Sequence, residues 1–188
     1  SYLHTVFVEW MRNAVGHISG VIAIDGKQVR RTKDAEQRPL HVVSAFASEA
    51  RLVIGQLACE QKSNEITAIP KLLEVLEIKG CIVTIDAMGT QTEIAKKIRE
   101  RGADFILSLK SNQPNLYEDV ALFFEDYMKD PKNRNDCSYA KTLSKGHGRI
   151  ETRECFCCEE IAWLHDRERW DGLSGIGVIR CRVEQNET

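Results

Sequence analysis

The order of its short apolar segments constrains the fold of this chain more than any other feature. Residues 21–24, 81–85 and 105–109 are almost wholly apolar runs of strand length. Runs this short, bounded by polar residues or glycine, are typical of strands buried in a sheet. Two further strand candidates, 40–47 and 52–59, follow the first run and are separated by a short Ser-Glu-Ala-Arg turn. We therefore expect the chain to open with a three-stranded antiparallel meander.

Apolar residues at helical spacing fill the gaps between the later strands. Thr67 is the predicted N-cap of the first helix, because Pro70 is tolerated only near a first turn. The second helix is expected to begin with a capping box at 90–93 and to stop at Gly102. A third helix is predicted over 114–129, with proline at its first position.

Together these segments predict the order βββαβαβα, which indicates a mixed α/β sheet. Strands that are apolar on both faces further predict a sheet covered on two sides. After residue 136 the pattern changes to short alternating segments with glycine between them. We divide the chain into a lead-in helix at 1–19, an α/β core at 20–136 and a small β-rich appendage at 137–188. Trp163 and Trp170 are predicted core residues of the appendage.

Two aspartates stand where the strands are expected to be buried. Asp25 follows the apolar run at 21–24, and Asp86 follows the run at 81–85. An ionised carboxylate in such surroundings costs on the order of several kcal/mol unless it is paired or binds a metal. If the two strands are neighbours, the carboxylates converge, and Mg²⁺, with Mn²⁺ as a substitute, is the natural counter-ion. The alternative is that each Asp simply ends its strand and caps a turn.

The overall charge is nearly balanced, with 26 Lys and Arg, 28 Asp and Glu, and a net charge of −2. This balance argues against a chain that binds nucleic acid over its whole surface. The segment 26–38 is nevertheless basic, with five basic and two acidic residues. It is either a phosphate-binding segment or a solvated charged loop.

An odd number of cysteines, seven, indicates free thiols in a reducing compartment. No apolar stretch approaches the roughly 18 residues of a membrane span. We therefore predict a cytoplasmic protein. A zinc site formed by Cys155, Cys157, Cys158, His165 and Cys181 is a weaker hypothesis, because structural zinc sites usually have a gap of about two to four residues within each cysteine pair.

Several sequence blocks occur in the same order as in one known family. They lie at residues 24–27, 62–66, 80–89, 109–113 and 147–153. On these blocks the chain, from about residue 6 onward, resembles bacterial H-repeat-associated insertion-sequence transposases of the DDE type. The resemblance implies an RNase H-like catalytic core, in which two Asp and one Glu hold two Mg²⁺ ions for DNA cleavage and strand transfer.

The resemblance also assigns roles to individual carboxylates. Asp25 and Asp86 are similar in position to the first and second catalytic, metal-binding residues. Glu151 is a candidate for the third, although related transposases carry this Glu on a late helix in an Arg-x-x-Trp-x-Ile-Glu context that does not occur here. We therefore expect the third ligand to lie beyond Thr188. A chain with two carboxylates would bind metal weakly and show little or no strand transfer.

The partners implied by the resemblance are DNA and a second copy of the protein. The DNA would be the terminal inverted repeats and the target, and a homodimer would hold two ends in a synaptic complex. The candidate DNA-binding residues lie just after the first aspartate or after the last core strand: Lys27, Arg30, Arg31, Lys110, Asn112 and Gln113.

Two alternatives stay open at this point. A structure-selective nuclease on the same fold would share the carboxylates but ignore the ends of a mobile element. A catalytically incomplete relic would keep the fold and act only in DNA binding or assembly.

Overall fold

The structure is a computed structural model that describes Val6 and residues 18–33, 39–59, 65–129, 137–146 and 149–185. The lead-in helix predicted for 1–19 lies almost entirely outside these residues. The chain divides into two compact units, Ser1–Gln113 with Arg169–Gly172, and Pro114–Glu168 with Leu173–Thr188. The domain boundaries predicted from the sequence stay a prediction.

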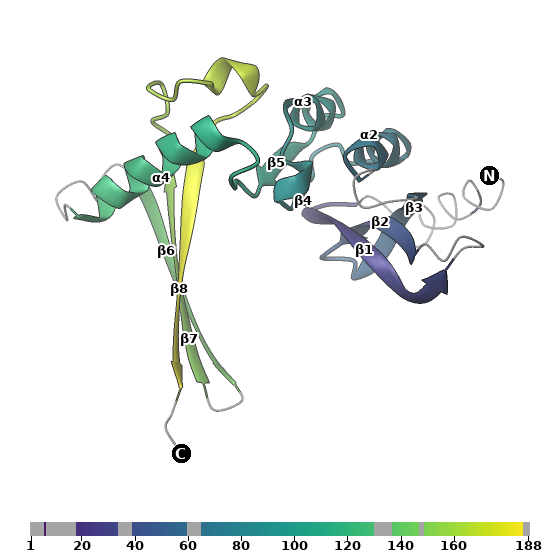
Figure 1. Cartoon of the computed structure of the whole chain (residues 1–188), viewed down its shortest axis with the longest axis horizontal. Coiled ribbons are helices and arrows are strands. Elements are labelled where there is room, and N and C mark those ends of the chain that lie inside the picture. Colours follow the sequence, from purple (N-terminus) through teal and green to yellow (C-terminus); the bar gives the residue numbers. More distant parts are fainter. Residues whose placement is uncertain are drawn as a thin grey trace. The chain divides into compact units, whose positions relative to one another are not determined.

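A five-stranded mixed sheet forms the first unit, in the order β3-β2-β1-β4-β5 (Figure 1). The first three strands are antiparallel neighbours, whereas β4 runs parallel to both β1 and β5. Their bounds are β1 Val21–Lys33, β2 Pro39–Ala47, β3 Leu52–Cys59, β4 Ile82–Ile85 and β5 Asp104–Leu107. The predicted mixed α/β fold with an RNase H-like element order is confirmed.

Helix α2 (Glu65–Val75) begins earlier than predicted. Its first residue is Glu65, so Thr67, the predicted N-cap, lies within the helix. Pro70 therefore lies inside the helix, where it removes one backbone hydrogen bond. The helix tolerates this loss because its apolar face is buried: Ala68, Ile69, Leu72 and Leu73 are each at most 4% exposed. Burial of that face contributes about 1.5–3 kcal/mol for each large side chain, which outweighs one lost hydrogen bond.

The predicted capping box at the start of the next helix is wrong. The short 3₁₀ turn η2 (Ala87–Gly89) precedes α3 (Thr92–Glu100), whose N-cap is Gln91 without a side-chain capping bond. The Thr90 hydroxyl instead donates to a carbonyl in the loop after β5, as described below. Gly102 ends the helical region in the left-handed conformation, with φ at +72°, as expected of a helix stop.

The prediction that the sheet is covered on both sides is wrong for its parallel half. Val83 and Ile85 are at most 4% exposed, whereas Ile82 and Ile106 are 37% and 63% exposed. Within this unit α2 and α3 lie on the same side of the sheet (Figure 1). The apolar run of β4 therefore has one buried and one open face.

The second unit contains α4 (Pro114–Lys129) and a three-stranded antiparallel sheet in the order β6-β7-β8. Its strands are β6 Cys137–Gly146, β7 Arg149–Cys158 and β8 Ile176–Gln185, and the short turn η4 (Arg167–Arg169) precedes β8. Pro114 is the first helical residue, as predicted.

Candidate functional site

The structure brings Asp25 and Asp86 to adjacent positions on neighbouring strands. β1 and β4 are parallel, and their register ends with Ile24 opposite Ile85. Asp25 is the next residue of β1, and Asp86 is the first residue after β4. Since Ile24 and Ile85 are buried beneath the sheet and side chains alternate along a strand, both aspartates lie on the open face. Both are exposed to solvent.

The two aspartates differ in their local structure, and one expectation about Asp25 is wrong. β1 does not end before Asp25 but continues to Lys33, and Asp25 pairs with Ser44 of β2. Asp25 is therefore a mid-strand residue and not part of a turn. The turn interpretation is correct only for Asp86, whose Oδ1 accepts a hydrogen bond from the Met88 N–H at 3.1 Å and caps η2.

A polar row extends from the two aspartates across the sheet. Ser44 pairs with Asp25 on one side and with Gln56 of β3 on the other. The Gln56 side-chain amide donates to the Ser44 hydroxyl at 3.2 Å. Neither residue could be expected from the sequence, because their place beside Asp25 depends on strand register.

Lys27 is the cation nearest to Asp25 among the described ion pairs. Its Nζ lies 3.4 Å from Asp25 Oδ2, and the two side chains are 79% and 55% exposed. An exposed pair of this kind contributes only about 0–1 kcal/mol to stability. It leaves the Asp25 carboxylate accessible to an incoming ion.

Glu65 is a further acidic residue close to Asp25 in the chain fold, but it lies on the other side of the sheet. It is 5% exposed, and a Cβ built on Gly26 would collide with its carboxylate. Because neighbouring strand residues point to opposite faces, Glu65 lies on the buried face and Asp25 on the open one. Glu65 is the first residue of α2, where the helix dipole favours a negative charge. Burial and, to a smaller extent, this charge raise the pKa of the Cys59 thiol.

The pair of carboxylates on the open face of the sheet fits a hard divalent cation. Asp25 and Asp86 supply carboxylate oxygens, the ligands that Mg²⁺ prefers, and Mg²⁺ commonly binds proteins through only one or two carboxylates and keeps several waters. Over the ranges that the structure describes, no group of three or more His, Cys, Asp or Glu side chains is arranged to hold a metal. That finding also covers the cysteines of the zinc hypothesis, none of which forms a disulfide.

Glu151, the candidate for the third catalytic carboxylate, lies in β7 of the second unit. Its carboxylate is 15% exposed and lies 2.5 Å from an Arg153 guanidinium nitrogen. The Cys181 thiol also donates to it at 3.2 Å. These contacts engage the carboxylate within its own sheet.

The candidate DNA-binding residues fall into three groups. Lys27 and Lys110 are exposed. Arg30 and Arg31 lie in β1, but their side chains are outside the described part of the structure. Asn112 and Gln113 donate their side-chain amides to backbone carbonyls of Ala87 and Thr90.

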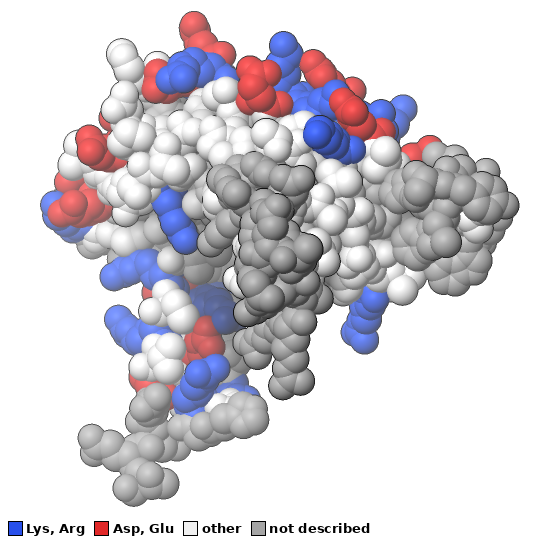
Figure 2. Space-filling view, turned by 45° about the vertical axis from the view of Figure 1, so that its right-hand side comes forward, with Lys and Arg blue, Asp and Glu red and all other residues white. Residues whose placement is uncertain are grey.

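A concentration of basic side chains occurs on one face of the three-stranded sheet. The register of β6, β7 and β8 places Lys141, Lys145, Arg180 and Arg182 on the same face, together with Glu154 and Glu184. All four cations are exposed. Figure 2 shows more Lys and Arg than Asp and Glu on this part of its surface, at the lower left. The near-neutral total charge therefore conceals a local basic surface.

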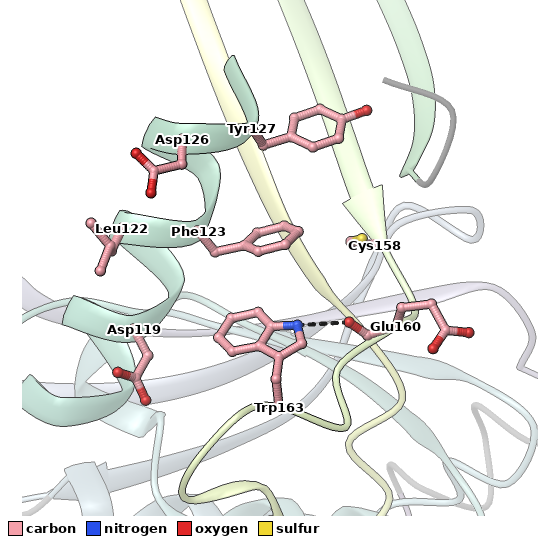
Figure 3. A pocket seen from close by; sticks show the side chains of 8 residues that line it. All are labelled: Asp119, Leu122, Phe123, Asp126, Tyr127, Cys158, Glu160 and Trp163. Carbon is pink, nitrogen blue, oxygen red and sulfur yellow. Dashed lines mark hydrogen bonds between the residues drawn. The ribbon is translucent and has the colours of Figure 1, made fainter. Parts of the chain in front are cut away.

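A pocket in the second unit has a different character. It has a volume of about 600 Å³ and is lined by α4 and the segment after β7. Phe123 and Trp163 stack at 4.9 Å, and the Trp163 indole N–H donates to the Glu160 carbonyl at 2.8 Å (Figure 3). Asp119, Asp126 and Glu160 also line it, so it does not favour phosphate. Trp163 is 45% exposed and is not the core residue predicted, whereas Trp170 is buried but belongs to the first unit and not to the appendage.

The fold and the comparison with known proteins indicate the same class of protein. A five-stranded mixed sheet of this order, with its β-α-β-α extension, is that of an RNase H-like core. Residues 16–154 match the family described as "Transposase DDE domain". The chain therefore belongs to the transposase DDE domain family.

Two relatives and one solved structure illustrate the similarity. The chain is 39% identical over 183 residues to an uncharacterized protein in the dhlA 3′ region of Xanthobacter autotrophicus, covering 96% of this chain and 61% of that protein. It is 43% identical over 182 residues to the "H repeat-associated putative transposase YhhI" of Escherichia coli K12, covering 93% of this chain and 47% of that protein. A piggyBac transposase synaptic complex with hairpin DNA aligns with a TM-score of 0.41 and 10% identity, over 71% of this chain and 30% of that one.

The resemblance to H-repeat-associated transposases is thus confirmed. The chain spans about half to three-fifths of the length of these two curated relatives. No described helix is both long enough and apolar enough to cross a membrane.

Proposed function

We propose that this chain is the catalytic-core part of a DDE transposase that cleaves and joins DNA strands at the ends of a mobile element. One observation carries the proposal: Asp25 and Asp86 are the residues that follow a register pair on the two central parallel strands. Two carboxylates so placed on an open sheet face repel each other unless a cation lies between them. A pair of this kind is expected to hold a divalent ion.

In this proposal Asp25 and Asp86 hold Mg²⁺, or Mn²⁺ in its place. When bound, the metal would activate the attacking hydroxyl or water and stabilise the leaving oxygen of a phosphodiester. The protein's own contribution is to fix the carboxylates on one face of the sheet and to leave that face open to DNA. In the proposal Lys27 contacts a phosphate beside Asp25, which is supported by its exposed side chain and by its Nζ lying 3.4 Å from Asp25 Oδ2.

The proposed partner is DNA, both the inverted repeats at the element's ends and the target. The basic face of the three-stranded sheet supports this, because clustered Lys and Arg supply the salt-dependent part of DNA affinity. A homodimer would bring two ends together. We place this activity in the cytoplasm, in keeping with cysteines that form no disulfide among the described residues.

Titration of Mn²⁺ by isothermal calorimetry tests the metal site directly. The wild-type chain is compared with Asp25→Ala and Asp86→Ala, and Glu100→Ala serves as a matched control that removes an exposed carboxylate from α3. We expect saturable heat from the wild type and the control and its loss in both aspartate variants. Equal heats in all four chains would exclude the two-aspartate site.

A catalytically incomplete module is the second candidate function. One observation favours it: within the part of the chain that the structure describes, Asp25 and Asp86 are not joined by a third metal-binding side chain. Nicking of supercoiled plasmid DNA in Mn²⁺ distinguishes the two. Metal binding with aspartate-dependent nicking supports the enzyme, whereas metal binding without nicking supports the incomplete module.

A further inference from the structure

Asp86 belongs to a short connection whose own hydrogen bonds do not tie it to the sheet. This Asp86 segment, residues 86–91, joins β4 to α3. The Met88 N–H donates to Asp86 Oδ1 and the Gly89 N–H donates to the Asp86 carbonyl, both at 3.1 Å. These local bonds set the shape of the turn. Its orientation must be fixed by contacts from elsewhere in the chain.

The loop after β5, residues 108–113, supplies two such contacts. Asn112 Nδ2 donates to the Ala87 carbonyl at 2.6 Å, and Gln113 Nε2 donates to the Thr90 carbonyl at 3.0 Å. Ala87 and Thr90 stand at either end of the 3₁₀ turn. The side-chain amides of two consecutive residues therefore donate hydrogen bonds to the Asp86 segment at both ends of η2.

Thr90 adds a third connection between the same two segments. It is 2% exposed, and its hydroxyl lies 2.7 Å from the Ser108 carbonyl and 3.3 Å from the Asp86 carbonyl. A hydroxyl donates one proton, and the shorter distance favours Ser108 as the acceptor. The Ser108 N–H in turn donates to the Ile85 carbonyl at 3.1 Å, directly before Asp86.

We infer that Asn112 and Gln113 are positioning residues, which act through the Asp86 segment and hold the Asp86 carboxylate beside Asp25. The inference rests on the proposed function, because the position of Asp86 matters only if it binds metal. It gives the two amides a role other than the DNA contact expected from the sequence. Residues that orient metal ligands typically change metal affinity by about 10–100-fold when they are removed.

The test measures Mn²⁺ binding to the ¹⁵N-labelled chain by calorimetry and by paramagnetic broadening of backbone amide signals. The variants are Asn112→Ala and Gln113→Met, the second of which keeps side-chain length but removes the donor. Asn115→Ala, an exposed asparagine in the first turn of α4, is the matched control. We expect each test variant to bind Mn²⁺ about 10-fold more weakly, and the control to bind like the wild type.

Backbone amide chemical shifts separate positioning from a general loss of structure. Mn²⁺ should broaden amides near Asp25 and Asp86 together in every chain that binds it, because the two residues lie beside each other. In metal-free Asn112→Ala and Gln113→Met, amide shifts should change within the Asp86 segment and stay as in the wild type in β2 and β3, whereas partial unfolding would change both. Wild-type affinity in both variants, or weaker affinity with shift changes throughout the chain, overturns the inference. If the wild type shows no aspartate-dependent Mn²⁺ binding, the proposed metal site fails instead.

Discussion

The two aspartates lie on adjacent strand positions, yet the chain holds them in different ways. Asp25 is inside β1, where the backbone ladder with β2 continues through it and beyond. Asp86 lies just past the end of β4, and its segment is held by side chains from a loop more than 20 residues away, including Asn112 at a separation of 25. A backbone ladder is insensitive to side-chain replacement, whereas a side-chain brace can be removed by one substitution. The Asp86 side is therefore the adjustable half of the candidate site.

The largest expected effect tests how closely α2 packs on the Asp25 strand. A Cβ on Gly26 would collide with the Glu65 carboxylate, which has little room to move because Glu65 is 5% exposed. Gly26→Ala should therefore lower the free energy of unfolding by about 1–3 kcal/mol, as overpacking usually does. Urea denaturation followed by circular dichroism measures the change.

The control for this prediction is Gly146→Ala, since nothing lies within 4 Å of a Cβ built at this strand glycine. It should change stability by less than about 0.5 kcal/mol. In the Glu65→Ala background, Gly26→Ala should lower the free energy of unfolding by less than it does in the wild type, because the carboxylate is gone. An undiminished cost would mean that the collision is not its cause.

A smaller effect compares the aspartates directly in the absence of metal. Asp86→Ala removes the cap of η2 and should cost about 0.5–1 kcal/mol of unfolding free energy. Asp25→Ala removes only an exposed ion pair with Lys27 and should stay within about 0.5 kcal/mol of the wild type. Both values come from urea denaturation in the presence of a chelator. Equal costs would contradict the idea that only Asp86 supports its own segment.

The smallest effect concerns the ion pair that joins α2 to α3. Lys97 Nζ of α3 lies 2.9 Å from Glu74 Oε1 of α2. The hydrogen bond from this ammonium, together with its charge, lowers the pKa of the Glu74 carboxyl below its ordinary value. Since the pKa is lower in the folded state, the stabilisation is present above the unfolded pKa, about 4.3, and disappears as pH falls through the folded value.

Carbon-detected NMR titration of Glu74 measures this shift. Lys97→Ala should raise the titration midpoint of Glu74, because it removes the hydrogen bond and the charge that lower it. It should affect stability near neutral pH but not below the folded pKa of Glu74. An unmoved Glu74 midpoint would show that the ion pair does not persist in solution.

Much of the fold could be predicted because it depends on local patterns. The strands of the meander, the helix that begins at Pro114 and the stop at Gly102 follow from apolar periodicity and from the backbone preferences of proline and glycine. The errors arose where a distant contact overrides a local signal. Thr90 looks like an N-cap, but its hydroxyl is closest to a carbonyl of the loop after β5. Asp25-Gly26 looks like a turn, but pairing with β2 extends the strand through it.

The sequence by itself determined that two aspartates follow apolar strands in an order typical of a mixed sheet, because strand length and alternation are local properties. Tertiary structure alone decided that those strands are parallel neighbours in a register that sets Asp25 beside Asp86. It also decided that Glu65 faces the buried side and that Asn112 and Gln113 reach back to the Asp86 segment. These facts depend on register and on loop closure between distant segments, which no local pattern encodes.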